Sequence, residues 1–341
     1  MKRIWIFLLI AGCSTVDTKP ETPTEVSFKT PEGFPDPVYR FENTPITTAG
    51  FELGRALFYD GKLSRDGSIS CADCHQQEAA FSHFDHDVSH GIDDRLGTRN
   101  APALFNLAWH SDFFWDGGVH DLDLQPPSAI MNKNEMDESL DRVLEKLRKD
   151  SKYPALFRSA YGTEEVTTAR FLKALSQFML MMVSSNSKYD RYIRKEAGIT
   201  LTADEQEGLR VFNLKCATCH PAPLFTDLKF RNNGLMPTPN PDLGRALITL
   251  KDEDRLTFKV PSLRNVTESP PYMHDGRFSS LARVLEHYNS GVQATENLDP
   301  LLNQNGRRGI ALSNTEKQVL LAFLKTLKDD SFLSDKRFSH P

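Results

Sequence analysis

The chain has 341 residues, a formal net charge of −5 and 39% hydrophobic residues. This composition is ordinary for a soluble protein and leaves room for one large or two medium domains. The acidic balance, without any run of basic residues, argues against nucleic acid as a partner.

The chain begins like an export signal. Two basic residues precede a short apolar run at 4–10, far below the roughly 20 residues that a membrane-spanning helix needs. Small residues then lead to Cys13, so that residues 1–13 resemble a bacterial lipoprotein signal whose cysteine becomes the lipidated first residue. The alternative is an ordinary secretory signal in which Cys13 is incidental. The lipoprotein interpretation predicts a periplasmic protein that touches the membrane through its anchor alone.

Residues 14–47 are rich in Thr, Pro and Glu. Such a composition is typical of a linker, and we expect this segment to be a flexible tether.

Five cysteines in an exported chain would normally suggest disulfides. Apart from Cys13, however, all of them lie in two C-x-x-C-H units at 71–75 and 216–220. This is the attachment signature of c-type haem, in which the thiols bind the porphyrin and the histidine is the proximal iron ligand. A redox-active C-x-x-C pair should open a helix in a βαβ context, which is absent here, and half of a zinc site would not require the histidine in both copies. The predicted haem-binding residues are Cys71, Cys74, His75, Cys216, Cys219 and His220.

The two halves of the chain repeat each other. An E-x0–1-G-x-x-x-F segment precedes each haem motif, at 52–58 and 207–212. A P-x-L-x-N segment follows each motif, at 102–106 and 261–265, with an Asp-Gly pair ten residues past each asparagine. Matched offsets of this kind indicate a duplicated domain.

We expect a mainly α fold with two tandem cytochrome c-like haem domains and long loops. Capping boxes predict helix starts at Thr202 and Ser313, and the apolar segment 163–185 is predicted to be a long helix joining the halves. The predicted units are an N-terminal domain at 48–162, a linking helix region at 163–200 and a C-terminal domain at 201–335.

From about residue 51 to 327 the chain resembles the bacterial di-haem cytochrome c peroxidase and MauG family. The resemblance is carried, in this order, by ELGRALFYDGKLSRDGSISCADCH, GTRNAPALFN, FFWDGG, NEM, CATCH and FKVPSLRNVTESPPYMHDGRF. In that family the N-terminal haem reacts with peroxide and the C-terminal haem supplies electrons. The resemblance therefore implies two covalent haems and reduction of hydrogen peroxide to water by a small periplasmic donor, a cytochrome c or a cupredoxin.

Two other functions stay open at this stage. One is a MauG-like oxidase acting on a protein substrate, and the other is a non-catalytic electron-transfer or haem-sensing protein. The family often dimerises, which leaves a homodimer open as well.

The resemblance also implies ligands near the first haem. His90, in the segment SHG, matches a histidine that binds the resting iron and moves away on activation. His83 and His86 are alternatives, but we expect them to be solvated loop residues. The iron of some members lacks such a ligand altogether.

Three further residues match catalytic positions of the family. Glu135, in NEM, and Gln125 match the pair that serves proton transfer while the O–O bond breaks. Trp115 matches a tryptophan between the two haems. One departure is that Gly118 stands where the family usually has arginine after W-D-G.

At the second haem, the position of the family's distal methionine falls on Tyr288. A tyrosine here resembles MauG, and its phenolate favours Fe(III) where a thioether would raise the potential. Met273 is the rival ligand and His287 a weaker one.

The family also binds calcium between its haem domains. Asn100 matches the side-chain ligand, and Ser269 and Pro271 match two carbonyl ligands. Oxygen donors of this kind suit Ca²⁺.

Overall fold

The structure is a computed structural model that describes residues 24–341, apart from residue 85. The predicted signal and Cys13 lie outside the described residues. Within the described part, no helix is long and apolar enough to cross a bilayer.

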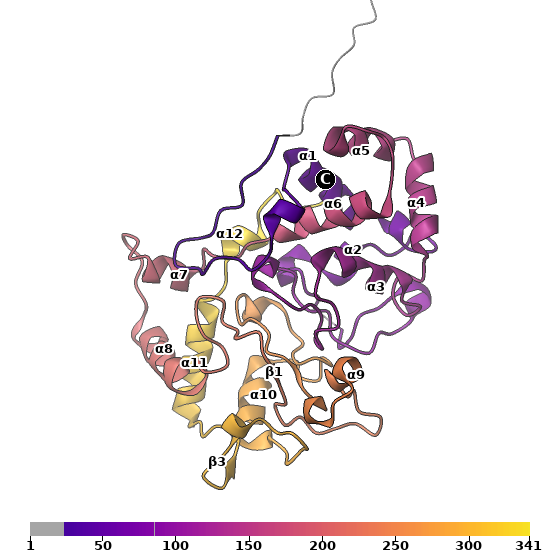
Figure 1. Cartoon of the computed structure of the whole chain (residues 1–341). Helices are drawn as coiled ribbons and strands as arrows, with labels where there is room; N and C mark the ends of the chain where they lie inside the picture. The colour runs from indigo at the N-terminus through magenta and orange to yellow at the C-terminus, as the bar shows by residue number, and fades with distance from the viewer. Residues whose placement is uncertain (1–23, 85) are drawn as a thin grey trace, which may run out of the picture.

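The fold is mainly α, as predicted, with two short antiparallel strand pairs and long loops. The halves lie one above the other in Figure 1, the first half uppermost. The helices are α1 (Thr48–Phe58), α2 (Cys71–Cys74), α3 (Pro126–Met131), α4 (Leu140–Lys149), α5 (Tyr153–Tyr161), α6 (Thr168–Leu180), α7 (Lys188–Ile193), α8 (Ala203–Lys215), α9 (Ala246–Thr249), α10 (Leu281–Glu286), α11 (Asn314–Lys325) and α12 (Asp330–Leu333). The strand pairs are β1 (Phe230–Arg231) with β2 (Phe258–Lys259), and β3 (Asn303–Gln304) with β4 (Arg307–Arg308).

Each half is built on one closely crossed helix pair, α1 with α6 and α8 with α11 (Figure 1). The crossing point is the glycine of the repeated E-x0–1-G-x-x-x-F segment. A Cβ atom added at Gly54 would lie 2.0 Å from the carbonyl oxygen of Ala174, and one at Gly208 would lie 2.0 Å from that of Val319. Only glycine allows the backbones to approach this closely, which explains why the segment occurs twice.

The repeated asparagines join the halves. Asn106 and Asn265 both have left-handed backbones, with φ of 56° and 55°. The Asn106 side chain accepts from the backbone N of Ser184 at 3.0 Å, and the Asn265 side chain accepts from the backbone N of Asp329 at 2.8 Å. Asn265 also donates to the Ser184 hydroxyl at 3.0 Å, so these four buried residues form one hydrogen-bond network between the halves.

The predicted flexible tether is wrong for residues 24–47, because this segment packs on the first half. Val26 donates its backbone N–H to the carbonyl of Ile46, which is buried. Phe28 packs on Trp109 at 5.7 Å between ring centroids, and the Trp109 indole N–H donates to the Pro35 carbonyl at 2.8 Å. Aromatic side chains spread among the Thr and Pro residues supply the contacts that average composition does not reveal.

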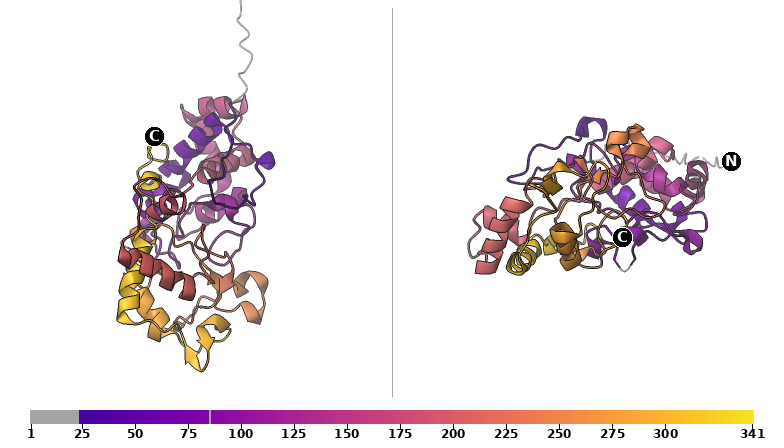
Figure 2. Two further views of the ribbon diagram at one scale, coloured as in Figure 1. Left: turned by 90° about the vertical axis from the view of Figure 1, so that its left-hand side faces the viewer. Right: turned by 90° about the horizontal axis from the view of Figure 1, so that it is seen from below.

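Packing divides the chain differently from the predicted boundaries. α6 lies in the hydrophobic core of the first half, and it is shorter than the predicted 163–185 helix. Phe332 and Phe338, near the C-terminus, belong to the same core. The C-terminus accordingly lies beside the first half, as Figure 1 and the left view of Figure 2 show.

Candidate active site

The first C-x-x-C-H motif begins with a capped turn. The backbone N–H of Ser70 donates to the Asp73 carboxylate at 2.6 Å, which starts α2. Nδ1 of His75 then lies 2.8 Å from the carbonyl oxygen of Phe81. A hydrogen bond from Nδ1 to a carbonyl fixes the tautomer and leaves Nε2 available for a metal. The imidazole is therefore arranged as an iron ligand would be.

The second motif repeats this geometry. α8 ends at Lys215, directly before the motif, and Nδ1 of His220 lies 3.1 Å from the carbonyl oxygen of Phe225. The four motif cysteines form no disulfide. Burial raises the pKa of Cys71 and Cys74 to about 12, which argues against the reactive thiolate of a redox-active pair. Among the described residues, no cluster of three or more His, Cys, Asp or Glu side chains is placed to hold a zinc ion. The residues thus fit covalent haem better than the alternatives.

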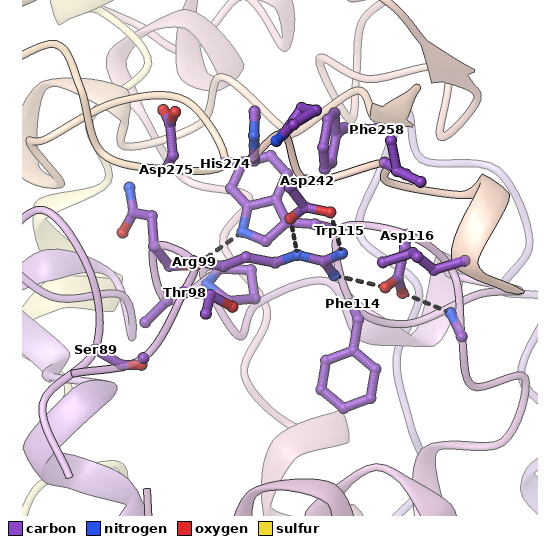
Figure 3. A pocket seen from close by; sticks show the side chains of 18 of the residues that line it. Ser89, Thr98, Arg99, Phe114, Trp115, Asp116, Asp242, Phe258, His274 and Asp275 are labelled. Atoms are coloured by element: carbon purple, nitrogen blue, oxygen red, sulfur yellow. Dashed lines mark hydrogen bonds and ion pairs between the residues drawn. The ribbon is translucent and has the colours of Figure 1, made fainter. Parts of the chain in front are cut away.

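A cavity of about 940 Å³ opens between the halves and is lined by residues of both. Cys74 and His75 form part of its wall. The three predicted catalytic residues, Trp115, Gln125 and Glu135, line it as well. Residues that are far apart in the sequence therefore share one space, part of which Figure 3 shows.

Three of the four carboxylates that line the described cavity are neutralised by arginine. Arg99 donates to Asp242 at 2.6 and 2.9 Å and to Asp116 at 2.5 Å (Figure 3). Arg277 donates to Asp275 at 2.8 Å. Burial alone would raise the pKa of Asp242 and Asp275, but the hydrogen bonds from Arg99 and Arg277 bring it below its ordinary value.

Glu135 is the fourth carboxylate, and its partner is neutral. The Asn132 amide donates to Glu135 Oε1 at 2.8 Å. Burial raises the pKa of Glu135, and this hydrogen bond opposes the rise. Among the described carboxylates of the cavity, Glu135 is thus the one without an arginine partner, and the direction of its pKa shift suits proton exchange.

Trp115 connects the two halves. Its indole N–H donates to the carbonyl of Asn100 at 2.8 Å, and its own carbonyl accepts from the backbone N–H of Lys259 in β2 at 2.7 Å. The indole lies beside the Arg99 ion pairs in Figure 3. Its position suits both interdomain packing and an electron path.

Gly118 has a charged counterpart in the second half. The repeat aligns it with Arg277, which pairs with Asp275 two residues earlier. In the first half, Asp116 instead pairs with Arg99, and its backbone carbonyl accepts from Arg245 at 3.1 Å. The cation missing at Gly118 is therefore replaced from elsewhere in the chain.

The histidine loop differs in part from expectation. His83 is buried, with 3% exposure, and its Nε2 lies 2.7 Å from Asn100 Oδ1, so the expectation that it is solvated was wrong. His86 is exposed, as expected. The His90 ring stacks on His86 at 4.2 Å and is not among the described residues lining the cavity.

Tyr288 lies in a π-helix, His287–Gly291, that follows α10. Such local insertions are frequent at functional sites, and no residue pattern predicted this one. Burial raises the pKa of Tyr288 to about 12, the neighbouring Asn233 side chain lowers it, and the thiols of the second motif add to the rise. The Asn233 amide also contacts Met273 Sδ at 3.4 Å, so both rival ligands meet one amide. His287 instead contacts the Asn233 carbonyl, at 3.0 Å.

Asn100 lies where a calcium site was predicted. Its amide nitrogen donates to the carbonyls of Pro271, at 2.7 Å, and Met273, at 3.2 Å. Asn100 and Pro271 are thus brought together, whereas Ser269 is not among the hydrogen-bond partners of Asn100 in the described chain.

Sequence reasoning missed the ion pairs that shape the cavity. Arg99 stands inside the recognised segment GTRN, but its partner Asp242 lies 143 residues away in a proline-rich loop. It also missed Asn132, three residues before Glu135, although an amide at that spacing is a common local partner.

The fold and the site together define a two-domain protein with a c-type haem motif in each half and a cavity between the halves. Residues 48–198 match the family model described as di-haem cytochrome c peroxidase. The methylamine utilization protein MauG of Methylorubrum extorquens is 35% identical over 93% of this chain and 88% of its own length. The cytochrome c551 peroxidase of Nitrosomonas europaea is 32% identical over 84% of this chain and 82% of its own.

A solved structure agrees with these relatives. The crystal structure of a MauG-like protein associated with microbial copper homeostasis has a TM-score of 0.84 and 31% identity, covering 93% of this chain and 99% of that one. The chain therefore belongs to the di-haem cytochrome c peroxidase family of oxidoreductases, which carry two c-type haems.

Proposed function

We propose that this protein reduces hydrogen peroxide to water with electrons from a small donor, a cytochrome c or a cupredoxin. The observation that carries the proposal is Glu135. It lines the same cavity as His75, and it lacks the arginine partner that the other three carboxylates have.

The reaction consumes one peroxide, two electrons and two protons and yields two water molecules. A haem held by Cys71, Cys74 and His75 would supply the iron at which peroxide is reduced. Glu135 accepts a proton from one peroxide oxygen and returns it to the departing one, which makes the departing group water. The Gln125 side chain, which faces the same cavity, orients the peroxide.

We assign electron entry to the haem of Cys216, Cys219 and His220. Trp115 lines the cavity between the halves and is hydrogen-bonded to both of them, which supports an electron path through it. Tyr288 is the proposed distal ligand of the entry haem because it is half-buried and lies near the thiols of the second motif. His90 is the proposed displaceable ligand of the resting first haem.

A calcium ion is also proposed at Asn100. Rotating the side-chain amide of an asparagine by half a turn exchanges its oxygen and its nitrogen. The two orientations are distinguished only by the hydrogen bonds around them. A flipped Asn100 would turn its oxygen toward the carbonyls of Pro271 and Met273, giving three oxygen donors. Ser269 remains a proposed carbonyl ligand.

Outside the described residues, Cys13 is the proposed lipid attachment point. It would hold the enzyme at a membrane surface facing the periplasm, where small reduced donors could reach it. A homodimer is the proposed assembly.

One observation favours a second candidate function, a MauG-like oxidase that acts on a protein substrate. Tyr288, rather than a methionine, occupies the proposed distal position of the second haem. A phenolate stabilises the more oxidised iron, which would let both haems hold oxidising equivalents.

The test is steady-state oxidation of a reduced cytochrome c by hydrogen peroxide, with calcium present. The haem-loaded protein is assayed fully oxidised and after half-reduction. Sustained turnover, increased by half-reduction, supports the peroxidase and the displacement of His90. A slowly decaying spectral change without donor oxidation would favour the oxidase instead.

A further inference from the structure

The segment after the last helix of each half crosses to the other half. α7 follows α6 of the first half and packs on the second, whereas α12 follows α11 of the second half and packs on the first. Figure 1 shows α12 beside α6, and the chain end beyond it beside α1. The exchange is reciprocal, and each crossing segment reaches the loop that follows a haem motif.

The C-terminal segment, residues 330–341, packs directly on the loop that orients His75. Phe81, whose carbonyl faces His75 Nδ1, is fully buried. Its ring lies 5.7 Å from Phe332 and 6.3 Å from Phe338, both almost fully buried. The Phe81 side chain is therefore held in place by residues near the C-terminus.

Hydrogen bonds fix the segment in this place. The Gln77 amide, two residues after His75, donates to the carbonyl of Asp335 at 2.8 Å and accepts from the Ser339 hydroxyl at 3.0 Å. The Tyr59 hydroxyl donates to the carbonyl of Phe338 at 2.6 Å. These bonds run to Gln77 within the His75–Phe81 loop and to Tyr59 at the end of α1.

The loop itself needs such support. Ala80 and Phe81 both have left-handed backbones, with φ of 56° and 57°. A residue other than glycine is strained in this backbone region, and the conformation persists only when the surroundings hold it. This strained pair aims the Phe81 carbonyl at His75.

The second half shows the same arrangement in reverse. Tyr189 of α7 packs on Phe225 at 5.1 Å, and the Phe225 carbonyl faces His220. Asp190 of α7 forms a bidentate pair with the buried Arg264, which donates to the carbonyl of Pro223 at 2.8 Å. Phe225 is also left-handed, with φ of 55°.

We infer that the C-terminal segment 330–341 is a positioning element for His75, acting through Phe81, and that α7 does the same for His220 through Phe225. Each proximal histidine is thus held by a segment anchored in the other half. The inference rests on the two haems of the proposed function, but not on peroxide turnover.

The hydrogen bond from Nδ1 should change the reduction midpoint of the haem in one direction. Donation from Nδ1 to a carbonyl makes the imidazole a stronger donor to iron, which stabilises Fe(III). Loosening Phe81 weakens this hydrogen bond, so the reduction midpoint of the first haem should rise. Loosening Phe225 should raise the midpoint of the second.

The test compares Phe332→Leu and Tyr189→Leu by redox titration of the two haems in the full-length, haem-loaded protein. Phe157→Leu is the matched control, because Phe157 is fully buried in the same core as Phe332 and contacts Tyr161 instead of Phe81. Thermal unfolding of each variant records the loss of stability separately.

The expected result is that Phe332→Leu raises one midpoint and Tyr189→Leu raises the other. Phe157→Leu should lower the unfolding temperature and leave both midpoints unchanged. The inference is overturned if the two crossing-segment variants move the same midpoint, both midpoints or neither. Failure of peroxide turnover in the unaltered protein would instead overturn only the proposed function.

Discussion

The replacement Glu135→Gln should remove the proton exchange that the cavity provides. Glutamine keeps the size of the side chain and can still meet the Asn132 amide, but it cannot take up a proton. Because Asp116, Asp242 and Asp275 are held by arginine, none of the other carboxylates described in the cavity is free to replace it. The whole contribution of general acid–base catalysis should be lost, about 100- to 10,000-fold in rate.

The assay is rapid mixing with hydrogen peroxide, following the spectrum of the haems against peroxide concentration. Glu138→Gln is the control, because Glu138 is almost fully buried three residues away and pairs with Lys146 at 2.7 Å outside the cavity. This control should lose stability and keep the peroxide rate. A Glu135→Gln variant that reacts within about tenfold of the unaltered protein would refute the role assigned to Glu135.

Three further predictions follow from individual contacts. The active form of Glu135 is its carboxylate, and Asn132→Ala removes a hydrogen bond that opposes the burial-raised pKa. The acid limb of the pH–rate profile should therefore move to higher pH, and a move to lower pH would contradict the assignment. Arg264→Met leaves the Asp190 carboxylate buried without its partner and should lower the free energy of unfolding by about 3–5 kcal/mol, measured with a denaturant. An unchanged free energy of unfolding would count against the ion pair. Gly208→Ala should lower the free energy of unfolding by about 1–3 kcal/mol, because the added Cβ meets the backbone of α11, and this outweighs the better helix propensity of alanine. A more stable variant would show that the two helices can move apart.

Local signals in the sequence were sufficient for the haem motifs and for two helix starts. The capping boxes at Thr202 and Ser313 are present as predicted, because each needs only residues within one turn. The duplicated glycines and asparagines could be recognised from their spacing in the sequence. Their structural role depends on the helix that packs against each glycine and on the buried hydrogen-bond network of the asparagines.

Features that depend on distant partners were not predictable. The burial of His83 follows from its bond to Asn100, and the order of residues 24–47 follows from contacts with Trp109. The return of Phe332 to the first core joins residues about 250 positions apart, as its contact with Phe81 shows. Composition and periodicity describe a segment by itself and do not contain this information.

The most direct test of the central claim is the ratio of donor oxidised to peroxide consumed over many turnovers. The account predicts two molecules of a one-electron donor oxidised for each peroxide, with the turnover lost in Glu135→Gln. Consumption of peroxide without matching oxidation of the donor would contradict it.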